Sequence, residues 1–215
     1  MDNKEILSHV DHTQLKAFAK WEDIDTLCME AIKNNTACVC IPPAYVKQVR
    51  EKYADLRISV VIGFPLGYNT TAVKVFETKE AIKEGADEID MVINIGWAKD
   101  HQFGKITDEI KQIKEACKDN HLKVIIETCY LDEEEKIALC KCVTDGGAEY
   151  IKTSTGFGSA GATVADVELF KKYIGPNVKI KAAGGIRTKE DMDAYLEAGV
   201  DRIGCSAAVG LLGEK

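Results

Sequence analysis

Two lysines of this chain occupy positions where a charged side chain is unfavourable. Lys152 lies in the apolar segment 150–154, and Lys181 lies in the apolar segment 178–183. Both segments have the character of short buried strands that run into glycine-rich loops. A buried ammonium group is costly and tends to lose its proton, which converts it into an amine nucleophile. Two such lysines side by side are expected to lower each other's pKa further, and a neutral amine can form an imine with a carbonyl substrate.

This chemistry requires the two segments to be neighbours, so the elements around them matter. The hydrophobic pattern predicts eight strands, each followed by a helix. The predicted strands span residues 9–13, 37–41, 58–63, 88–94, 123–127, 150–154, 178–183 and 202–206. The predicted helices span residues 23–34, 71–84, 105–119, 132–145, 164–173 and 189–197, with a further helix that ends near residue 53 and short helices at both ends of the chain.

The strand candidates are continuous apolar runs, which is typical of parallel strands covered by helices. Eight such units predict a closed (β/α)8 TIM barrel that occupies residues 1–215 as a single domain, with a short N-terminal helix before the first strand. An open doubly wound sheet is the alternative. The first strand-to-helix turn lacks the Gly-x-Gly-x-x-Gly pattern, which disfavours a dinucleotide-binding form of that fold.

Composition excludes several classes of function. The net charge of −7, with acids and bases interspersed, disfavours nucleic acid as a partner. The sequence contains no apolar run near the roughly 20 residues that span a bilayer, and its N-terminus lacks a secretory signal pattern. The eight cysteines lack the spacing of zinc ligands, so they are expected to be reduced residues of a cytoplasmic protein.

Polar residues fall at the predicted strand ends, where TIM barrels carry their active sites. Lys152 and Lys181 are expected on adjacent strands six and seven, with Asp90 on strand four facing them across the mouth. Cys40 lies on a strand that leads toward the same place. The other polar residues of this group are Asp11, Asn94, Glu127 and Ser206.

Other strand lysines have a simpler explanation, because a lone lysine commonly extends its amine to the surface or pairs with an acid. This is expected for Lys123 and Lys179. Lys179 shares a strand face with Lys181, so we place it at the lower rim of the barrel.

Glycine-rich stretches follow the last three strands, at residues 155–158, 183–187 and 204–207. Glycine allows close backbone approach, so exposed N–H groups can converge on phosphate oxygens. The loops after strands seven and eight are a recurrent phosphate site in this fold. Arg187 could add charge there, but it is expected to pair on the surface.

Several of these segments together resemble one known family. They are residues 11–13 (DHT), 88–94 (EIDMVIN), 123–128 (KVIIET), 151–156 (IKTSTG) and 181–187 (KAAGGIR). In this order they are similar to the deoxyribose-phosphate aldolase family, over residues 6–210. The resemblance implies a class I aldolase without metal or cofactor, which reversibly cleaves 2-deoxy-D-ribose 5-phosphate to acetaldehyde and D-glyceraldehyde 3-phosphate.

The resemblance also implies roles for individual residues. Lys152 matches the imine-forming lysine, Lys181 the lysine that lowers its pKa, and Asp90 the aspartate that relays protons through a water molecule. Residues expected to bind substrate are Asp11 (which would bind a substrate hydroxyl), Thr13, Cys40, Gly156, Gly184, Gly185, Gly204 and Ser206. The chain ends at Lys215 without the longer tyrosine-terminated tail of some members, so slower turnover or a substitute proton relay is expected.

Two other functions remain open from the sequence. One is a lysine-dependent aldolase or transaldolase that acts on a ketose phosphate. The other is a non-catalytic barrel that binds a phosphosugar. The fold makes a homodimer or homotetramer the expected assembly.

Overall fold

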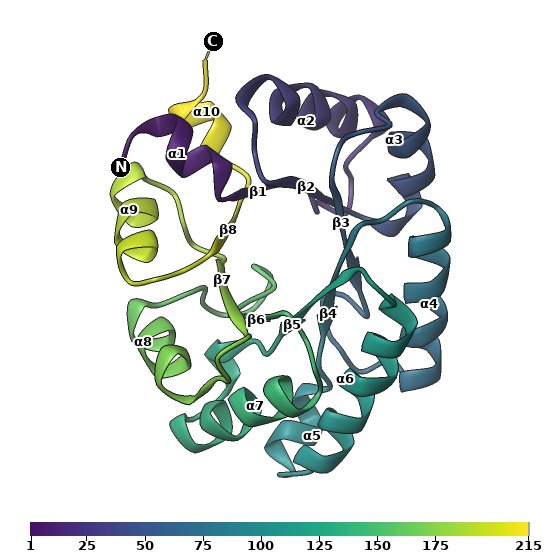
Figure 1. Cartoon of the computed structure of the whole chain (residues 1–215), viewed down its shortest axis with the longest axis vertical. Helices are drawn as coiled ribbons and strands as arrows, with labels where there is room; N and C mark the ends of the chain where they lie inside the picture. The colour runs from purple at the N-terminus through teal and green to yellow at the C-terminus, as the bar shows by residue number, and fades with distance from the viewer. Residues whose placement is uncertain (215) are drawn as a thin grey trace.

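Eight parallel strands form a closed barrel in the computed structural model, which describes residues 1–214 (Figure 1). Each strand pairs with the next along the chain, and β8 pairs with β1 to close the ring. The strands are β1 (Val10–Thr13), β2 (Cys38–Ile41), β3 (Ile58–Ile62), β4 (Glu88–Val92), β5 (His121–Ile125), β6 (Tyr150–Lys152), β7 (Lys179–Ala183) and β8 (Arg202–Cys205). The predicted TIM barrel is confirmed, and the open sheet is excluded by the pairing of β1 with β8.

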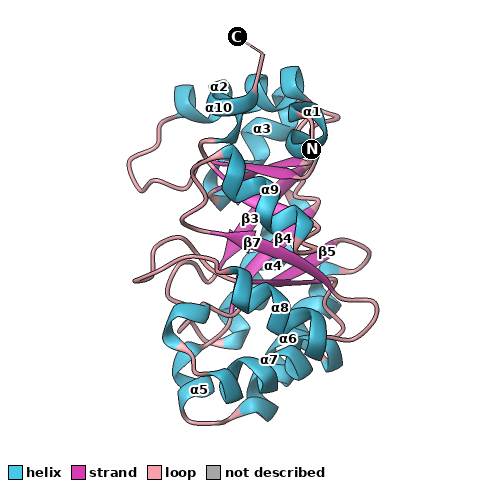
Figure 2. Ribbon diagram, turned by 90° about the vertical axis from the view of Figure 1, so that its left-hand side faces the viewer, coloured by secondary structure: helices cyan, strands magenta, loops and turns pink. Residues whose placement is uncertain are grey.

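Helices surround the strands (Figures 1 and 2). They are α1 (Asn3–Ser8), α2 (Trp21–Asn34), α3 (Val46–Lys52), α4 (Thr71–Lys83), α5 (Ile95–Lys99), α6 (Phe103–Cys117), α7 (Glu133–Asp145), α8 (Val164–Tyr173), α9 (Lys189–Glu197) and α10 (Ala208–Leu212). Short 3-10 turns occupy Pro43–Tyr45 and Thr128–Tyr130. The sequence did not predict α5, which is only five residues long and begins where Asn94 accepts a hydrogen bond from the Trp97 N–H.

Helix caps explain why two predicted helices, α8 and α9, coincide with the observed ones. Thr163 accepts a hydrogen bond from the Asp166 N–H at the start of α8. Thr188 and Asp191 form a capping box at the start of α9. Such side chains satisfy N–H groups that have no partner within the helix, so they fix its first residue.

Apolar side chains fill the space between strands and helices. Ile151 of β6 and Ile180 of β7, which flank the two lysines in sequence, are buried in this core with Phe170 of α8. Alternation along a strand therefore turns the lysines to the opposite face, into the barrel. None of the helices in residues 1–214 combines the length and apolar character needed to cross a membrane.

One buried ion pair lies outside the barrel, between α4 and α6. The Nζ of Lys74 is 2.9 Å from Oε2 of Glu109 and donates to the carbonyl oxygen of Val92 at 2.8 Å. Both side chains are fully buried. This pair connects two helices to the end of β4, the strand that carries Asp90.

Candidate active site

The register of β6 and β7 places the two lysines side by side. Lys152 and Lys181 are direct partners across the parallel pair, so their side chains leave the sheet on the same face and at the same height. Lys152 is 3% exposed and Lys181 is fully buried. The neighbouring strands that the sequence predicted are therefore present.

Asp90 of β4 joins the two amines. Its Oδ2 accepts hydrogen bonds from the Nζ of Lys152 and the Nζ of Lys181, each at 2.7 Å. Its Oδ1 accepts from Ser59 Oγ at 2.8 Å and from Lys123 Nζ at 2.9 Å. The sequence predicted that Asp90 faces the two lysines across the mouth of the barrel. In the structure it contacts both of them directly.

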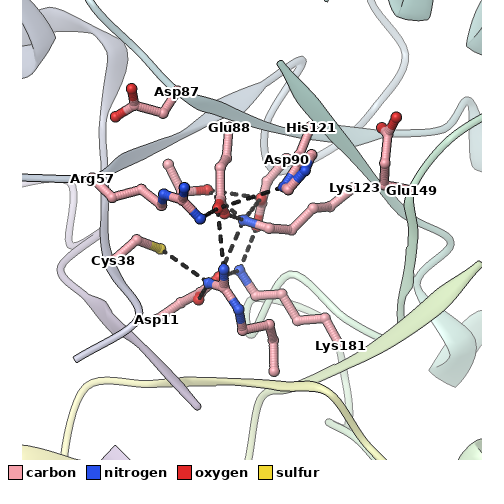
Figure 3. A network of polar contacts seen from close by, with 12 residues as sticks. Asp11, Cys38, Arg57, Asp87, Glu88, Asp90, His121, Lys123, Glu149 and Lys181 are labelled. Carbon is pink, nitrogen blue, oxygen red and sulfur yellow. Dashed lines mark hydrogen bonds and ion pairs between the residues drawn. The ribbon is translucent and has the colours of Figure 1, made fainter. Parts of the chain in front are cut away.

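A second ionic layer lies beside this triad, and Figure 3 shows its members Asp11, Glu88 and Lys123 directed toward one another. Lys123 of β5 contacts Glu88 at 2.6 Å and Asp11 at 3.2 Å. Arg202 of β8 contacts the same two acids, Glu88 at 3.1 Å and Asp11 at 2.5 Å. For Lys123 the sequence left open a surface position or pairing with an acid, and the structure shows the second: its side chain is fully buried, because interior carboxylates satisfy its amine.

The charges of this interior cluster do not balance when every group is ionised. Four cations face three carboxylates: Lys123, Lys152, Lys181 and Arg202 against Asp11, Glu88 and Asp90. Loss of one proton from the cluster makes it neutral, and an unbalanced buried charge is costly. The cluster therefore favours one neutral lysine, and the surroundings of each amine decide which lysine it is.

Burial lowers the pKa of Lys152, and the positive charge of Lys181 lowers it further, against the opposing effect of Asp90. Burial also acts to lower the pKa of Lys181, but the charges of Asp11 and Asp90 outweigh it and raise that pKa. The same balance, with Asp11, Asp90 and Glu88, raises the pKa of Lys123. The expectation that the two lysines lower each other's pKa thus agrees with the structure for Lys152 and is wrong for Lys181, because Lys181 has two carboxylates.

Of the cluster's four cations, Lys152 is the one that also lines a cavity. The cavity has a volume of about 470 Å³ and lies at the carboxyl ends of β1, β6, β7 and β8. Most of its wall is formed by the glycine-rich loops and by the loop after β1. The predicted site residues in its lining are Thr13, Lys152, Gly156, Gly184, Gly185, Gly204 and Ser206.

Two predicted substrate-binding residues lie elsewhere. Asp11 is fully buried, and its carboxylate contacts Lys181, Lys123 and Arg202 instead of the cavity. Cys40 is fully buried too, and burial raises the pKa of its thiol. Asp11 contacts Lys123 and Lys181 from within the barrel, and a direct contact of Asp11 or Cys40 with substrate remains a prediction.

The side chain of Arg187 lines the cavity, although surface pairing was expected for it. It is exposed, and within residues 1–214 no carboxylate forms an ion pair with its guanidinium. Lys179 is exposed as predicted, and its Nζ lies 5.7 Å from the centre of the Tyr150 ring.

Sequence reasoning missed several residues of this region. Lys123 and Arg202 share their strand faces with the site residues, since Lys123 pairs with Asp90 and Arg202 pairs with Lys181, but the sequence did not show which acids they contact. Thr155 and Phe157 fall within the glycine-rich stretch 155–158, but the sequence did not assign them to the cavity, because their approach to it depends on the path of one loop.

Asp11, Cys38 and Glu88 come close enough together to resemble a metal site, with ligand atoms within 4.8 Å of one another. The Lys123 amine and the Arg202 guanidinium already contact both carboxylates. These two cations repel a metal ion, so the donor set does not fit one.

Comparison with known proteins agrees with this geometry. A model of the DeoC/LacD family aldolase matches residues 3–212. A deoxyribose-phosphate aldolase of Clostridium botulinum is 58% identical over 213 residues, covering 99% of this chain and 96% of the relative. One of Clostridioides difficile is 55% identical over 210 residues, covering 97% of this chain and 96% of the relative. The tetrameric deoxyribose phosphate aldolase of Aeropyrum pernix superposes with a TM-score of 0.88 at 30% identity, covering 98% of this chain and 91% of that one. The chain therefore belongs to the DeoC/LacD family of aldolases.

Proposed function

We propose that this chain is a class I deoxyribose-phosphate aldolase. It reversibly cleaves 2-deoxy-D-ribose 5-phosphate to acetaldehyde and D-glyceraldehyde 3-phosphate through an imine on Lys152. The observation that carries the proposal is the position of Lys152, whose pKa is lowered and which lines the cavity beside a charged lysine. Relatives named for this activity match nearly the whole chain.

Imine formation begins with the neutral amine of Lys152. Its nitrogen attacks C1 of the open-chain sugar phosphate, and the resulting carbinolamine loses water to give a protonated imine. Asp90, 2.7 Å from this nitrogen, offsets the positive charge that the imine carries. The imine restores the excess positive charge of the cluster, and this charge is relieved when the bonding electrons of the substrate reach the imine nitrogen.

Cleavage of the C2–C3 bond follows. The C3 hydroxyl loses its proton, a carbonyl forms at C3, and the bonding electrons move through C2 to the imine nitrogen to give an enamine. D-glyceraldehyde 3-phosphate leaves. Asp90 is fully buried and does not line the cavity, so a water molecule must carry the hydroxyl proton to it.

The enamine then takes a proton at C2, and hydrolysis of the resulting imine releases acetaldehyde and restores Lys152. No metal is required in this scheme, because the imine acts as the electron sink.

Phosphate recognition is assigned to the backbone of the glycine-rich loops. Gly184 has a φ of +81°, and a Cβ there would lie 3.1 Å from the Gly161 Cα, so this position suits only glycine. Gly156, Gly185, Gly204 and Ser206 line the same wall. Binding of the phosphate away from the reacting carbons positions C1 at the amine.

The test is an activity assay with excess chelator. Acetaldehyde release from 2-deoxy-D-ribose 5-phosphate is expected in the wild type and should be lost in Lys152→Met. Cleavage of a ketose phosphate in its place would indicate the alternative lysine-dependent aldolase or transaldolase. Thermal stabilisation by the sugar phosphate with no turnover would indicate a binding barrel.

We also infer a homodimer or homotetramer located in the cytoplasm. The Aeropyrum pernix relative is described as tetrameric, which supports self-association. The eight cysteines are all unpaired, and seven are buried, as is common in a reducing compartment. Light scattering coupled to gel filtration measures the assembly directly.

A further inference from the structure

Glu127 has a backbone conformation that is unusual for its residue type. It follows β5 and has φ 55° and ψ 66°, in the left-handed region that favours glycine. The residues on either side are held by β6 and its extension: the Ile126 N–H donates to the Lys152 carbonyl at 3.1 Å, and the Thr128 N–H donates to the Thr153 carbonyl at 3.0 Å. Such strain persists where surrounding contacts fix it, and it commonly marks a functional position.

The turn directs the Glu127 carboxylate onto the loop that follows Lys152. Its Oε1 accepts a hydrogen bond from the Thr155 N–H at 3.1 Å, and its Oε2 accepts one from the Thr155 hydroxyl. The side chain is 2% exposed, and within residues 1–214 no cation forms an ion pair with it. A buried carboxylate without a cation needs strong hydrogen bonds, so its contact with Thr155 is firmly specified.

Thr155 in turn fixes the position of the next residues of the loop through a second hydrogen bond. Because its hydroxyl proton points to Glu127, its oxygen is free to accept from the Phe157 N–H at 3.0 Å. The N–H groups of Thr155 and Phe157 are thereby used, whereas that of Gly156 donates to no acceptor in the part of the chain described. Gly156 lines the cavity with a φ of +85°.

The same contacts fix the position of an aromatic ring at the cavity. The ring of Phe157 lines the cavity and meets Phe64 edge to face, with centroids 5.4 Å apart. Gly158 packs against the carboxylate, since a Cβ there would lie 3.2 Å from the Glu127 Cδ and 2.8 Å from the Cys129 Sγ. The loop from Thr155 to Gly158 is therefore built around Glu127.

We propose that Glu127 is a positioning residue for substrate phosphate. By holding Thr155 at two atoms, it presents the Gly156 N–H to the cavity and keeps Phe157 against Phe64. Glu127 itself does not line the cavity, so it acts through the loop. This assignment rests on the proposed function only for the identity of the phosphate ester.

The variants Glu127→Ala and Thr155→Val remove the two halves of the contact. Each is expected to raise the KM for 2-deoxy-D-ribose 5-phosphate about tenfold and to leave the KM for unphosphorylated 2-deoxy-D-ribose within about twofold. Thr155→Ser keeps the hydroxyl and should restore the wild-type KM. The control Glu134→Ala removes an exposed carboxylate and should change neither value.

A measurement with inorganic phosphate separates this inference from the proposed function. Phosphate is expected to raise the Tm of the wild type, and Glu127→Ala should need about tenfold more phosphate for the same rise. A wild type that binds phosphate in this way but cleaves no sugar phosphate would refute the aldolase and leave the role of Glu127 intact. The role is overturned if phosphate does not stabilise the wild type, if folded Glu127→Ala and Thr155→Val bind phosphate normally, or if both KM values rise together.

Discussion

Replacement of Lys181 by methionine tests the electrostatic origin of the nucleophile. The amines of Lys152 and Lys181 each lie 2.7 Å from the same Asp90 oxygen, so they are at most about 5.4 Å apart (twice 2.7 Å). Two unit charges at that distance interact by about 3 kcal/mol at an effective dielectric constant of about 20. This corresponds to about two pKa units. The variant loses the positive charge that disfavours protonation of Lys152, so the pKa of Lys152 should rise by about that amount.

The assay is the rate of borohydride trapping with acetaldehyde as a function of pH. Only the neutral amine attacks, so a higher pKa of Lys152 moves the midpoint of the pH profile upward by about two units. The matched control is Lys179→Met, which removes an exposed lysine from the same face of the same strand and should leave the midpoint unchanged. If a folded Lys181→Met protein has the wild-type midpoint, the charge of Lys181 does not set the reactivity of Lys152.

Three further predictions concern stability, measured by urea unfolding. Lys123→Met deprives three buried acids of a shared partner and should lower the free energy of unfolding by about 3–5 kcal/mol, whereas Lys179→Met should change it by less than about 0.5 kcal/mol; equal losses would contradict a buried role. Burial acts to raise the pKa of Asp90, but its neighbouring lysines lower that pKa well below the ordinary value. The contribution of ionised Asp90 to stability is therefore complete above about pH 4, and it is lost as the pH falls through the pKa of Asp90 in the folded protein. Asp90→Asn should therefore flatten the fall in stability below about pH 4, and an unchanged slope in that range would refute this. Lys74→Met should also cost about 3–5 kcal/mol, and the added change Glu109→Gln should recover part of it; additive losses would show that the pair is not coupled.

The fold was predictable because its signals are local and repeated. Eight apolar strands alternate with eight helical segments, and all observed strands agree with the predicted ones to within two residues at either end. The adjacency of Lys152 and Lys181 follows from this order alone, since consecutive units of a barrel are neighbours. The short helix α5 was not predicted, because five residues carry too little periodicity.

The interior ion pairs were not predictable in the same way. For Lys123 the sequence left open a surface position or pairing with an acid and could not name the acid, because its contact Asp11 lies 112 residues away. The local sequence around a strand lysine is the same whether its amine is hydrogen-bonded by water or by a distant carboxylate. Glu127 shows a second limit. Its left-handed backbone conformation directs its side chain onto the loop after β6, but the sequence does not reveal that conformation, because glycine is the residue that usually adopts it.

The most direct test of the account is to locate the imine. The wild type is treated with acetaldehyde and sodium borohydride, and the reduced adduct is mapped by peptide mass spectrometry. A single modified residue, Lys152, is expected, because of the three lysines inside the barrel only Lys152 combines a lowered pKa with a place in the cavity wall. Modification of Lys181 in its place, or no adduct at all, would contradict the assignment of Lys152 as the nucleophile.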